Sequence, residues 1–488
     1  MNSKRCAVLL AFAAIFALSS CSGVKNPCTV NCGGGGSGTL NLVLTDTPPT
    51  GVSILSFTLP ISGISLTPTT GSAVSVYPGG TFELTRLQSD TSGIATNVSV
   101  PAGTYTSIQV TLGTTSGVFI NASGSTITSS AGTCLSAAVC ALPSGAATTI
   151  SVPLNNLTFS SSAVWLGLDF NLNNAITAAN GITVDLSQAN VLTVNTTPPT
   201  GSLPNGDTAF IDDFTGSVTA ISNSSITVSS TTRGSLTAVI NSSTPVYDPQ
   251  LQCPGQTGSL SCIQVGSVVS FQGALSTNAL ITATSLDVID VATKPADEVE
   301  GTIYPAVCNG GNNYGLIISD SLIATSGSPL AGAKYGQPVC LTVSPTATFA
   351  IDSGILFGQA GIPTSANFTS ASNLYAGQTV RAKITGAVAG ASNSVNATAT
   401  YVILRFSRLT GTVSSTSGAI VSLTGLPAYI TALPLTAQVS TYPNATLMEN
   451  FTSINSLASP NVVSISALLL GPTSGVTYPL HAAKIRLQ

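Results

Sequence analysis

The feature that most constrains the fold is the spacing of β-branched and apolar residues along the whole chain. Val, Ile, Leu and Thr recur every few positions, and no stretch after the N-terminus shows a sustained helical period. β-Branched side chains suit a pleated, half-buried surface. Only 6% of the 488 residues are charged, whereas 43% are hydrophobic, which is too apolar for a disordered chain. The sequence therefore predicts an all-β protein whose polar surface consists mainly of Ser, Thr, Asn and Gly.

The N-terminus has the pattern of an export signal. Lys4 and Arg5 precede an apolar segment, residues 7–18, that is too short to span a bilayer. The next residues are Ser19-Ser20-Cys21. This pattern resembles the lipobox of bacterial lipoproteins, in which the cysteine is acylated. The resemblance implies a signal peptide over residues 1–20, a palmitate-type lipid on Cys21 and a location at the cell outer membrane, on a side left open. An ordinary cleaved signal is the alternative.

Cysteine usage agrees with export. Apart from Cys6 and Cys21, the cysteines fall into local couples, which favours disulfide bonds over metal ligation in an exported chain. These couples are Cys28 with Cys32, Cys134 with Cys140, Cys253 with Cys262, and Cys308 with Cys340. Zinc is a poor alternative because the chain has one histidine and no C-x2-C pair. We expect disulfides of undetermined connectivity, and no metal or other cofactor.

Residues 39–195 form the first predicted domain, after a Gly-rich tether (residues 21–38) and before a Pro-rich linker (residues 196–209). Its motifs are Leu44-Thr45-Asp46-x-Pro48 and Ala102-Gly103-x-Tyr105, and the segments around them alternate like strands. These motifs resemble a domain of unknown function found near the N-terminus of bacterial lipoproteins. The resemblance implies a β-sandwich and brings no known activity.

A repeated unit follows, over residues 210–293, 297–406 and 407–488. Each unit opens with Gly-x-Val or Gly-x-Ile and later has an apolar residue, then Gly or Pro three positions on, then Val after three more. The opening glycines are Gly216, Gly301 and Gly411, and the late valines are Val269, Val380 and Val463. The middle unit carries an insertion. The pattern resembles another domain of unknown function from exported bacterial proteins, and we expect three small antiparallel barrels of the oligonucleotide/oligosaccharide-binding (OB) type.

Two strands alternate clearly enough to predict which side chains face inward. The inward sets are Val380, Ala382 and Ile384 in one strand, and Ala483, Ile485 and Leu487 in the last strand. The intervening charged residues, Arg381, Lys383, Lys484 and Arg486, are expected to face water.

Candidate catalytic groups are few. His481 has no acidic neighbour, so we expect a structural or exposed role for it. The carboxylates cluster as Asp212-Asp213, Asp287 with Asp290, and Asp297-Glu298 with Glu300. A solvated linker, a calcium site without calcium-loop spacing, and the carboxylate pair of a hydrolase are the three interpretations left open for them. Asp46 is expected to cap a turn before proline.

The segment between Cys308 and Cys340 brackets most of the insertion in the middle unit. Long loops in compact repeats often carry function, and a disulfide would hold this one in place. Tyr304, Tyr314 and Tyr335 belong to this region and are candidates for stacking on a sugar ring. A structural elaboration without a ligand is the alternative.

These observations favour a non-catalytic, lipid-anchored envelope protein for surface display, adhesion or binding of an extracellular polymer. Its expected partners are the membrane, through the N-terminal lipid, and polysaccharide or envelope proteins. Nucleic acid is not expected, because a phosphate backbone demands clustered Lys and Arg. Two alternatives remain: a periplasmic scaffold that binds protein partners, and a carboxylate-dependent hydrolase.

Overall fold

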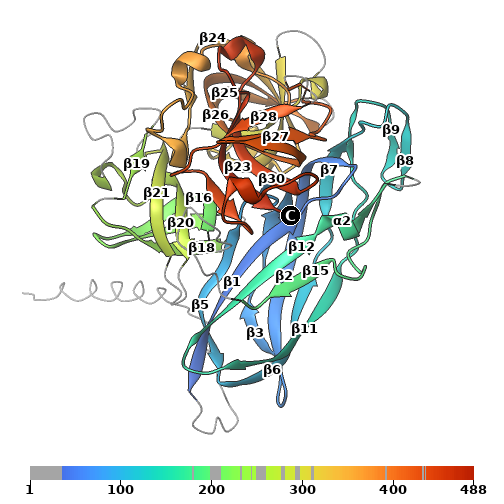
Figure 1. Cartoon of the computed structure of the whole chain (residues 1–488), viewed down its shortest axis with the longest axis vertical. Helices are drawn as coiled ribbons and strands as arrows, with labels where there is room; N and C mark the ends of the chain where they lie inside the picture. Colours follow the sequence, from blue (N-terminus) through green and yellow to red (C-terminus); the bar gives the residue numbers. More distant parts are fainter. Residues whose placement is uncertain are drawn as a thin grey trace, which may run out of the picture. The chain divides into compact units, whose positions relative to one another are not determined.

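The computed structural model describes residues 36–178, 181–197, 210–230, 234–242, 244–248, 260–275, 281–291, 297–308, 313–390, 393–430, 433–434 and 436–488. The predicted signal peptide, Cys21 and almost all of the predicted tether lie outside these residues. The described part is an all-β protein, as predicted, with a sandwich followed by three barrels (Figure 1). None of its helices is long and apolar enough to cross a membrane.

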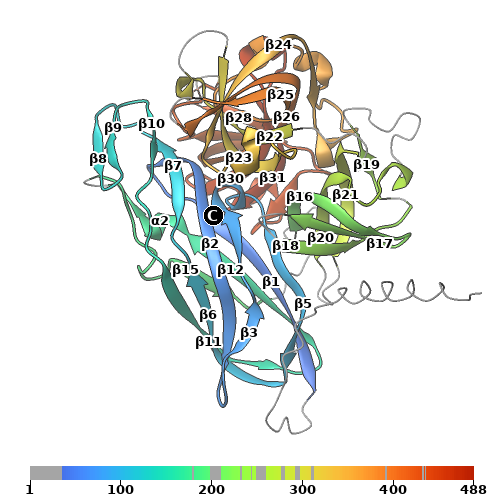
Figure 2. The same cartoon turned by 180° about the vertical axis from the view of Figure 1, so that it is seen from behind.

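The sandwich packs two sheets against each other. One has the strand order β15-β12-β1-β5 and consists of β15 (Leu192–Asn195), β12 (Ala163–Asn171), β1 (Ser37–Thr47) and β5 (Ser92–Pro101). The other has the order β10-β7-β2-β6-β11, with two further strands paired to β2 (Figure 2). Its members are β2 (Ser53–Pro68), β3 (Val74–Tyr77), β4 (Gly80–Glu83), β6 (Gly103–Leu112), β7 (Ser116–Ile120), β10 (Val139–Ala141) and β11 (Thr148–Phe159). Side chains from both sheets form one core, which confirms the predicted β-sandwich.

Short elements complete the sandwich. Two small hairpins pair β8 (Ile127–Ser129) with β9 (Gly132–Cys134), and β13 (Ile176–Thr177) with β14 (Thr183–Val184). Two single-turn helices, α1 (Leu84–Leu87) and α2 (Leu172–Ala175), begin where Glu83 and Asn171 accept hydrogen bonds from backbone N–H groups of the first turn. Helix α1 leads directly to Asp90, which contributes to the site described below.

The first barrel has the strand order of an OB fold. Its strands are β16 (Phe210–Ile221), β17 (Ser225–Ser230), β18 (Gly234–Val239), β20 (Val268–Leu275) and β21 (Ile281–Asp290), ordered β18-β17-β16-β20-β21. A parallel pair between β18 and β21 closes the barrel, and the short β19 (Val246–Tyr247) also pairs with β21. The predicted OB-like barrel is confirmed, but its closing pair is parallel because the third and fifth strands of this topology run in the same direction.

The second and third barrels repeat this order and share a strand. The second contains β22 (Asp297–Ile303), β23 (Asn313–Ile323), β24 (Pro338–Ile351), β25 (Thr379–Ala389) and the first part of β26 (Val395–Ser417). The third contains the rest of β26 with β27 (Ile420–Thr424), β28 (Ala437–Ser440), β29 (Leu447–Glu449), β30 (Val462–Leu469) and β31 (Leu480–Leu487). Strand β26 pairs with β25 up to Arg405 and with β30 from Phe406 onward. Two barrels therefore meet within one continuous strand.

Single turns of 3-10 helix lie in the barrel connections. They are η1 (Leu260–Cys262), η2 (Pro305–Val307), η3 (Pro329–Gly332), η4 (Gly354–Leu356), η5 (Ser365–Asn367), η6 (Ala371–Asn373), η8 (Ile454–Ser456) and η9 (Pro472–Ser474).

The glycines that open the first two barrels are required for a steric reason. A Cβ atom on Gly216 would lie 2.2 Å from the carbonyl oxygen of Ser229, and one on Gly301 would lie 2.0 Å from that of Ile317. Both distances are far below van der Waals contact, so only glycine lets the second strand cross the first this closely.

The two repeated motifs meet through equivalent hydrogen bonds. In each barrel, the N–H two positions after the opening glycine donates to the carbonyl oxygen just before the fourth strand. The bonds join Val218 to Ser267, Ile303 to Gln378 and Val413 to Asn461, each at 2.8 Å. The two motifs therefore recur together because, in each barrel, the first strand is hydrogen-bonded to the turn that precedes the fourth strand.

The disulfide in the second barrel does not enclose a loop, contrary to expectation. Cys308 and Cys340 are bonded, but the segment between them contains β23 and η3. Strand β23 is the second strand of the barrel. The disulfide therefore joins the residue that follows η2 to strand β24 within the barrel itself.

Candidate functional site

Charged side chains gather inside the molecule. Among those that the structure describes, Lys334 alone is fully exposed, and the others are buried or half-buried. Burying a charge is costly unless it is paired and hydrogen-bonded. Most of the buried charges form four clusters, and each cluster links parts of the chain that belong to different domains or strands.

The Arg405 cluster (Asp287, Glu300, Asp352, Arg381 and Arg405) joins the first two barrels. Glu300 accepts hydrogen bonds from Arg381 Nε at 2.8 Å and from Arg405 Nε at 3.4 Å, and Arg381 Nη2 lies 2.7 Å from Glu300 Oε2 as an ion pair. Arg405 also pairs with Asp352, and its Nη1 lies 3.9 Å from Asp287 Oδ2 of the first barrel. All five side chains are at most 3% exposed.

The Glu298 cluster (Asp290, Glu298 and Lys383) lies beside it. Lys383 Nζ is 3.3 Å from Glu298 Oε1 and 3.5 Å from Asp290 Oδ1. Glu298 and Lys383 are direct cross-strand partners on β22 and β25, whereas Asp290 ends β21 of the first barrel. Burial raises the pKa of Glu298 to about 7, against the opposing effects of Arg381 and Lys383. This carboxyl therefore exchanges a proton near neutral pH.

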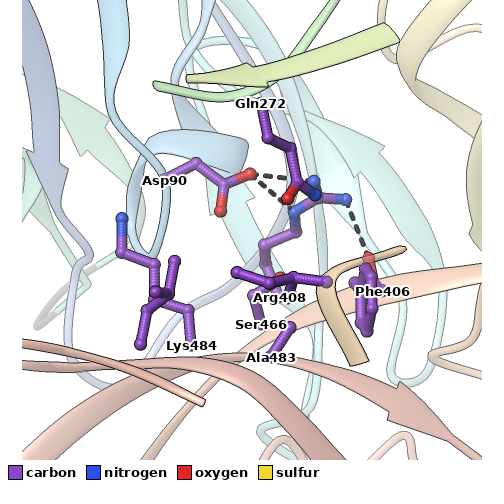
Figure 3. A pocket seen from close by; sticks show the side chains of 9 residues that line it. Asp90, Gln272, Phe406, Arg408, Ser466, Ala483 and Lys484 are labelled. Carbon is purple, nitrogen blue, oxygen red and sulfur yellow. Dashed lines mark hydrogen bonds and ion pairs between the residues drawn. The ribbon is translucent and has the colours of Figure 1, made fainter. Parts of the chain in front are cut away.

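The Arg408 cluster (Arg86, Asp90, Asp320 and Arg408) joins the sandwich to the second and third barrels. Arg408 binds Asp90 Oδ2 through Nε at 3.0 Å and Nη2 at 2.8 Å, and its Nη1 donates to the Phe406 carbonyl (Figure 3). Arg86 pairs with Asp320 at 2.5 Å. The adjacent cavity, also lined by Gln272 and Lys484, has a volume of about 10 Å³, room for about one water molecule.

The C-terminal cluster (Glu449, Lys484 and Arg486) fixes the last strand. Glu449 Oε2 lies 2.9 Å from both Lys484 Nζ and Arg486 Nε. Arg486 reaches on into the sandwich, where it donates to the carbonyl oxygens of Leu87 and Asp90 at 2.6 and 2.9 Å. Burial would raise the pKa of Glu449, but Arg486 and Lys484 hold it below its usual value.

Arg381 and Lys383 lie on the outer face of their strand, as predicted. The prediction that they face water was wrong, because this face is covered. Val380, Ala382 and Ile384 do point into the core of the second barrel. Their charged neighbours point outward, yet Arg381 is only 2% exposed, and the side chain of Lys383 only 17%. Alternation identifies the outer face of a strand, and it carries no information about a second domain that covers this face.

The last strand departs further from expectation. Lys484 and Arg486 are 1% and 4% exposed instead of facing water. A register shift in the β30–β31 ladder skips Ala483, so Ala482 faces the core of the third barrel while Ala483 packs against the core of the second. The bulge breaks the period of two that the prediction assumed.

The carboxylate clusters do not form a solvated linker. Asp287, Asp290, Glu298 and Glu300 are each at most 2% exposed and take part in ion pairs with basic side chains. In the described residues, no group of three or more His, Cys, Asp or Glu side chains is placed to hold a metal ion. The side chains of Asp212 and Asp213 lie outside the described part.

Asp46 does not cap a turn. It is 1% exposed, and neither of its carboxylate oxygens makes a hydrogen bond of good geometry, although the nearby backbone N–H of Leu172 opposes the rise of its pKa. It follows Leu42 and Leu44 on the core-facing side of β1. Burial, together with the nearby charge of Asp169, raises its pKa well above the usual value. The motif residue thus places a carboxyl group in the sandwich interior.

His481 has the structural role that was expected. It is 4% exposed, stacks on Tyr442 and shares a 2.7 Å hydrogen bond between Nδ1 and the Tyr442 hydroxyl. Burial lowers its pKa to about 4. The ring is therefore neutral at physiological pH.

The three predicted tyrosines do not form one ligand surface. Tyr304 is 7% exposed, donates its hydroxyl to the Ala137 carbonyl at 2.8 Å and packs edge-on against Tyr429. It is a contact between sandwich and barrel. Tyr314 and Tyr335 are half-buried against the core of the second barrel.

An aromatic pair that the sequence did not single out is more accessible. Phe357, directly after η4, is 64% exposed, and its ring centroid lies 5.2 Å from that of Tyr247 on β19. Neither residue belongs to a motif, and only the packing of the first two barrels brings them together.

Two of the expected cysteine couples are disulfides, Cys134–Cys140 and Cys308–Cys340. Cys28, Cys32 and Cys253 lie outside the described residues.

Of the comparisons with known proteins, the family match concerns the sandwich. None of the curated proteins compared with the chain matches it. A solved structure titled "drosophila Unr CSD456" is similar at 9% identity, covering 57% of this chain and 97% of its own, with a TM-score of 0.13. The family described as "Domain of unknown function (DUF4382)" matches residues 37–185. A DUF4382 domain therefore spans the sandwich part of this chain.

Proposed function

We propose that this protein is a non-catalytic, lipid-anchored component of a bacterial cell envelope that binds a neutral extracellular polymer, above all a polysaccharide. The observation that carries the proposal is the contrast between charged interior and nearly uncharged surface. Asp287, Asp290 and Glu300, the carboxylates that a hydrolase would need, are engaged in buried ion pairs. The exposed surface instead offers hydroxyl and amide groups, which suit hydrogen bonding to neutral sugars.

The aromatic pair of exposed Phe357 and half-buried Tyr247 is the contact surface we assign to this polymer. Aromatic rings provide a rigid apolar face with low conformational cost on binding. The apolar C–H face of a sugar ring would lie on Phe357, and the Tyr247 hydroxyl would supply a polar contact at its edge.

Co-sedimentation of the detergent-solubilised full chain with insoluble cellulose, chitin and peptidoglycan tests the proposal. We expect at least one of these polymers to retain the protein, and Phe357→Ala to weaken retention by about tenfold, equivalent to about 1.4 kcal/mol. Leu135→Ala is the matched control, since Leu135 is an equally exposed apolar residue (65%) on the sandwich. Equal loss in both variants, or no retention of the wild type, would contradict the assignment.

Lipidation at Cys21 is tested separately from polymer binding. Cys21→Ala should release the protein from membranes washed with carbonate, and retention of this variant would rule the anchor out. Protease treatment of intact cells then distinguishes surface display, in which the protein is cut, from the periplasmic scaffold, in which it is protected until lysis.

A further inference from the structure

The Glu298 cluster brings together a lysine and two carboxyl groups from two successive barrels. Lys383 Nζ lies 3.5 Å from Asp290 Oδ1 and 3.3 Å from Glu298 Oε1. Both acids are at most 2% exposed, and the lysine side chain is 17% exposed. Asp290 ends β21 and Lys383 lies in β25, and the two residues are 93 positions apart in sequence.

We propose that Lys383 and Asp290 condense to an intramolecular amide that covalently joins the first barrel to the second, with Glu298 carrying the proton. The proposal concerns a modification of the chain and does not depend on the proposed polymer binding.

The reaction balances without any co-reactant. A proton first passes from the Lys383 ammonium to the Asp290 carboxylate within their ion pair, and the amine then attacks Asp290 Cγ, which forms the C–N bond. The C–O bond to the hydroxyl group then breaks. Glu298 accepts a proton from the attacking nitrogen and delivers it to the departing hydroxyl, so that one water molecule leaves. An ammonium and a carboxylate are thereby exchanged for a neutral amide and water, with no change in net charge or oxidation state.

Burial favours the condensed form. Removing two ions from water costs several kcal/mol per ion, and their attraction repays this only with excellent geometry. A neutral amide does not carry this penalty. Lys383 is also held in place, since it faces Glu298 on one neighbouring strand and Tyr401 on the other. Holding the reacting groups a few ångströms apart supplies much of the entropy that the reaction needs.

Glu298 suits the role of proton carrier. Burial raises its pKa to about 7, and an acid or base works best when its pKa lies near the working pH. The carboxyl group can therefore both accept and return a proton under physiological conditions.

The C-terminal cluster provides an internal control. Lys484 also lies against a buried carboxylate, Glu449, at 2.9 Å. Arg486 binds the same oxygen, and the two cations lower the pKa of Glu449. An ionised carboxylate is a poor electrophile, so we expect Lys484 to remain a free amine.

Mass spectrometry of the purified, denatured and trypsin-digested full chain tests the proposal. We expect a branched peptide containing Lys383 and Asp290 that is lighter than its two components by one water molecule. Trypsin should not cleave after Lys383, and amine-reactive label should modify Lys484 but not Lys383. Glu298→Gln should leave the two peptides separate, and Asp290→Ala should do the same.

The outcome does not depend on how well the variants fold, because the wild-type digest decides it. Cleavage after Lys383, labelling of Lys383 to the same extent as Lys484 and unlinked peptides of full mass would overturn the proposal, and the cluster would then be an ion pair only. A branched peptide that persists in Glu298→Gln would refute the role of Glu298 as proton carrier.

Discussion

The Glu298 cluster and the C-terminal cluster contain the same kinds of groups, but the pKa of the glutamate is raised in the first and lowered in the second. Both have a buried glutamate next to a lysine on a neighbouring strand. Glu449 receives Lys484 and Arg486 without a competing acid, and its pKa is lowered. Glu298 shares Lys383 with Asp290, and its pKa is raised to about 7.

The comparison teaches that burial alone does not determine the charge of an internal carboxyl group. Desolvation raises the pKa in both clusters, and the local ratio of cations to acids decides whether it prevails. One cluster is thus a fixed ionic contact between the third barrel and the sandwich. The other exchanges protons near neutral pH.

The largest expected effect comes from breaking the fixed contact. Arg486→Met leaves Glu449 with one cation and leaves the carbonyl oxygens of Leu87 and Asp90 without their donor. Removing one partner of a buried ion pair typically costs about 3–5 kcal/mol. Urea unfolding should show a loss of this size, whereas Lys334→Met, at an exposed site, should stay within about 0.5 kcal/mol of wild type. Equal stability of both variants would refute the ionic contact.

The next effect is a pH dependence of opposite sign in the two clusters. Because the pKa of Glu298 is raised from 4.5 to about 7, its contribution to stability is complete below pH 4.5 and falls by about 3 kcal/mol as pH rises past 7. The pKa of Glu449 is lowered, so its contribution is complete at neutral pH and is lost as pH falls through that lowered value.

The measurement is the difference in unfolding free energy between wild type and Glu298→Gln, or wild type and Glu449→Gln, from pH 3 to pH 8. Differences are needed because His481, with its pKa lowered to about 4, destabilises the whole protein as pH falls. Loss of the proposed amide in Glu298→Gln would add a constant offset, so the slope is the test. If the difference in unfolding free energy changed with pH in the same direction for Glu298→Gln and for Glu449→Gln, the opposite pH dependence of the two clusters would be disproved.

Asp46 extends the comparison to a buried carboxyl group without a hydrogen bond of good geometry. Its pKa is raised by burial, so the folded protein is stabilised at low pH and loses that contribution as pH rises. Asp46→Asn should therefore raise stability at pH 8 by about 1–3 kcal/mol, the cost of an unsatisfied buried polar group. Thermal unfolding at pH 8 and pH 4 checks this, and a destabilised variant at pH 8 would show that the charge is compensated.

The smallest effect concerns the neutral pair of Tyr442 and His481. Tyr442→Phe removes the 2.7 Å hydrogen bond to Nδ1 and leaves the stacked rings in place. We expect a loss of about 1 kcal/mol in urea unfolding, as for a typical hydrogen bond. A loss as large as that of Arg486→Met would mean that this pair belongs to the ionic contact.

Much of the fold followed from local pattern. Alternation located β1, β6 and β12, and the repeated Gly-x-Val motif identified the barrels. In the first two barrels the opening glycine is required because a Cβ atom there would lie 2.2 Å or less from a carbonyl oxygen. The candidate site could be predicted less well from the sequence. The charged residues of β25 were placed on the correct face, but the bulge at Ala483 shifted the last strand, and no sequence signal revealed the domains that cover either set.

The sequence by itself determined the all-β class and the three repeated units, because side-chain alternation and turn glycines act between neighbouring strands. The sandwich and the OB type of the barrels were implied by resemblance to other domains. Tertiary structure alone decided where the charges lie and in which state. Glu298 belongs to an acidic run in the sequence, between Asp297 and Glu300, whereas Glu449 is a single acid. Their pKa values diverge because burial, with Asp290 adding to it, outweighs Arg381 and Lys383 at Glu298, whereas Arg486 and Lys484 outweigh burial at Glu449.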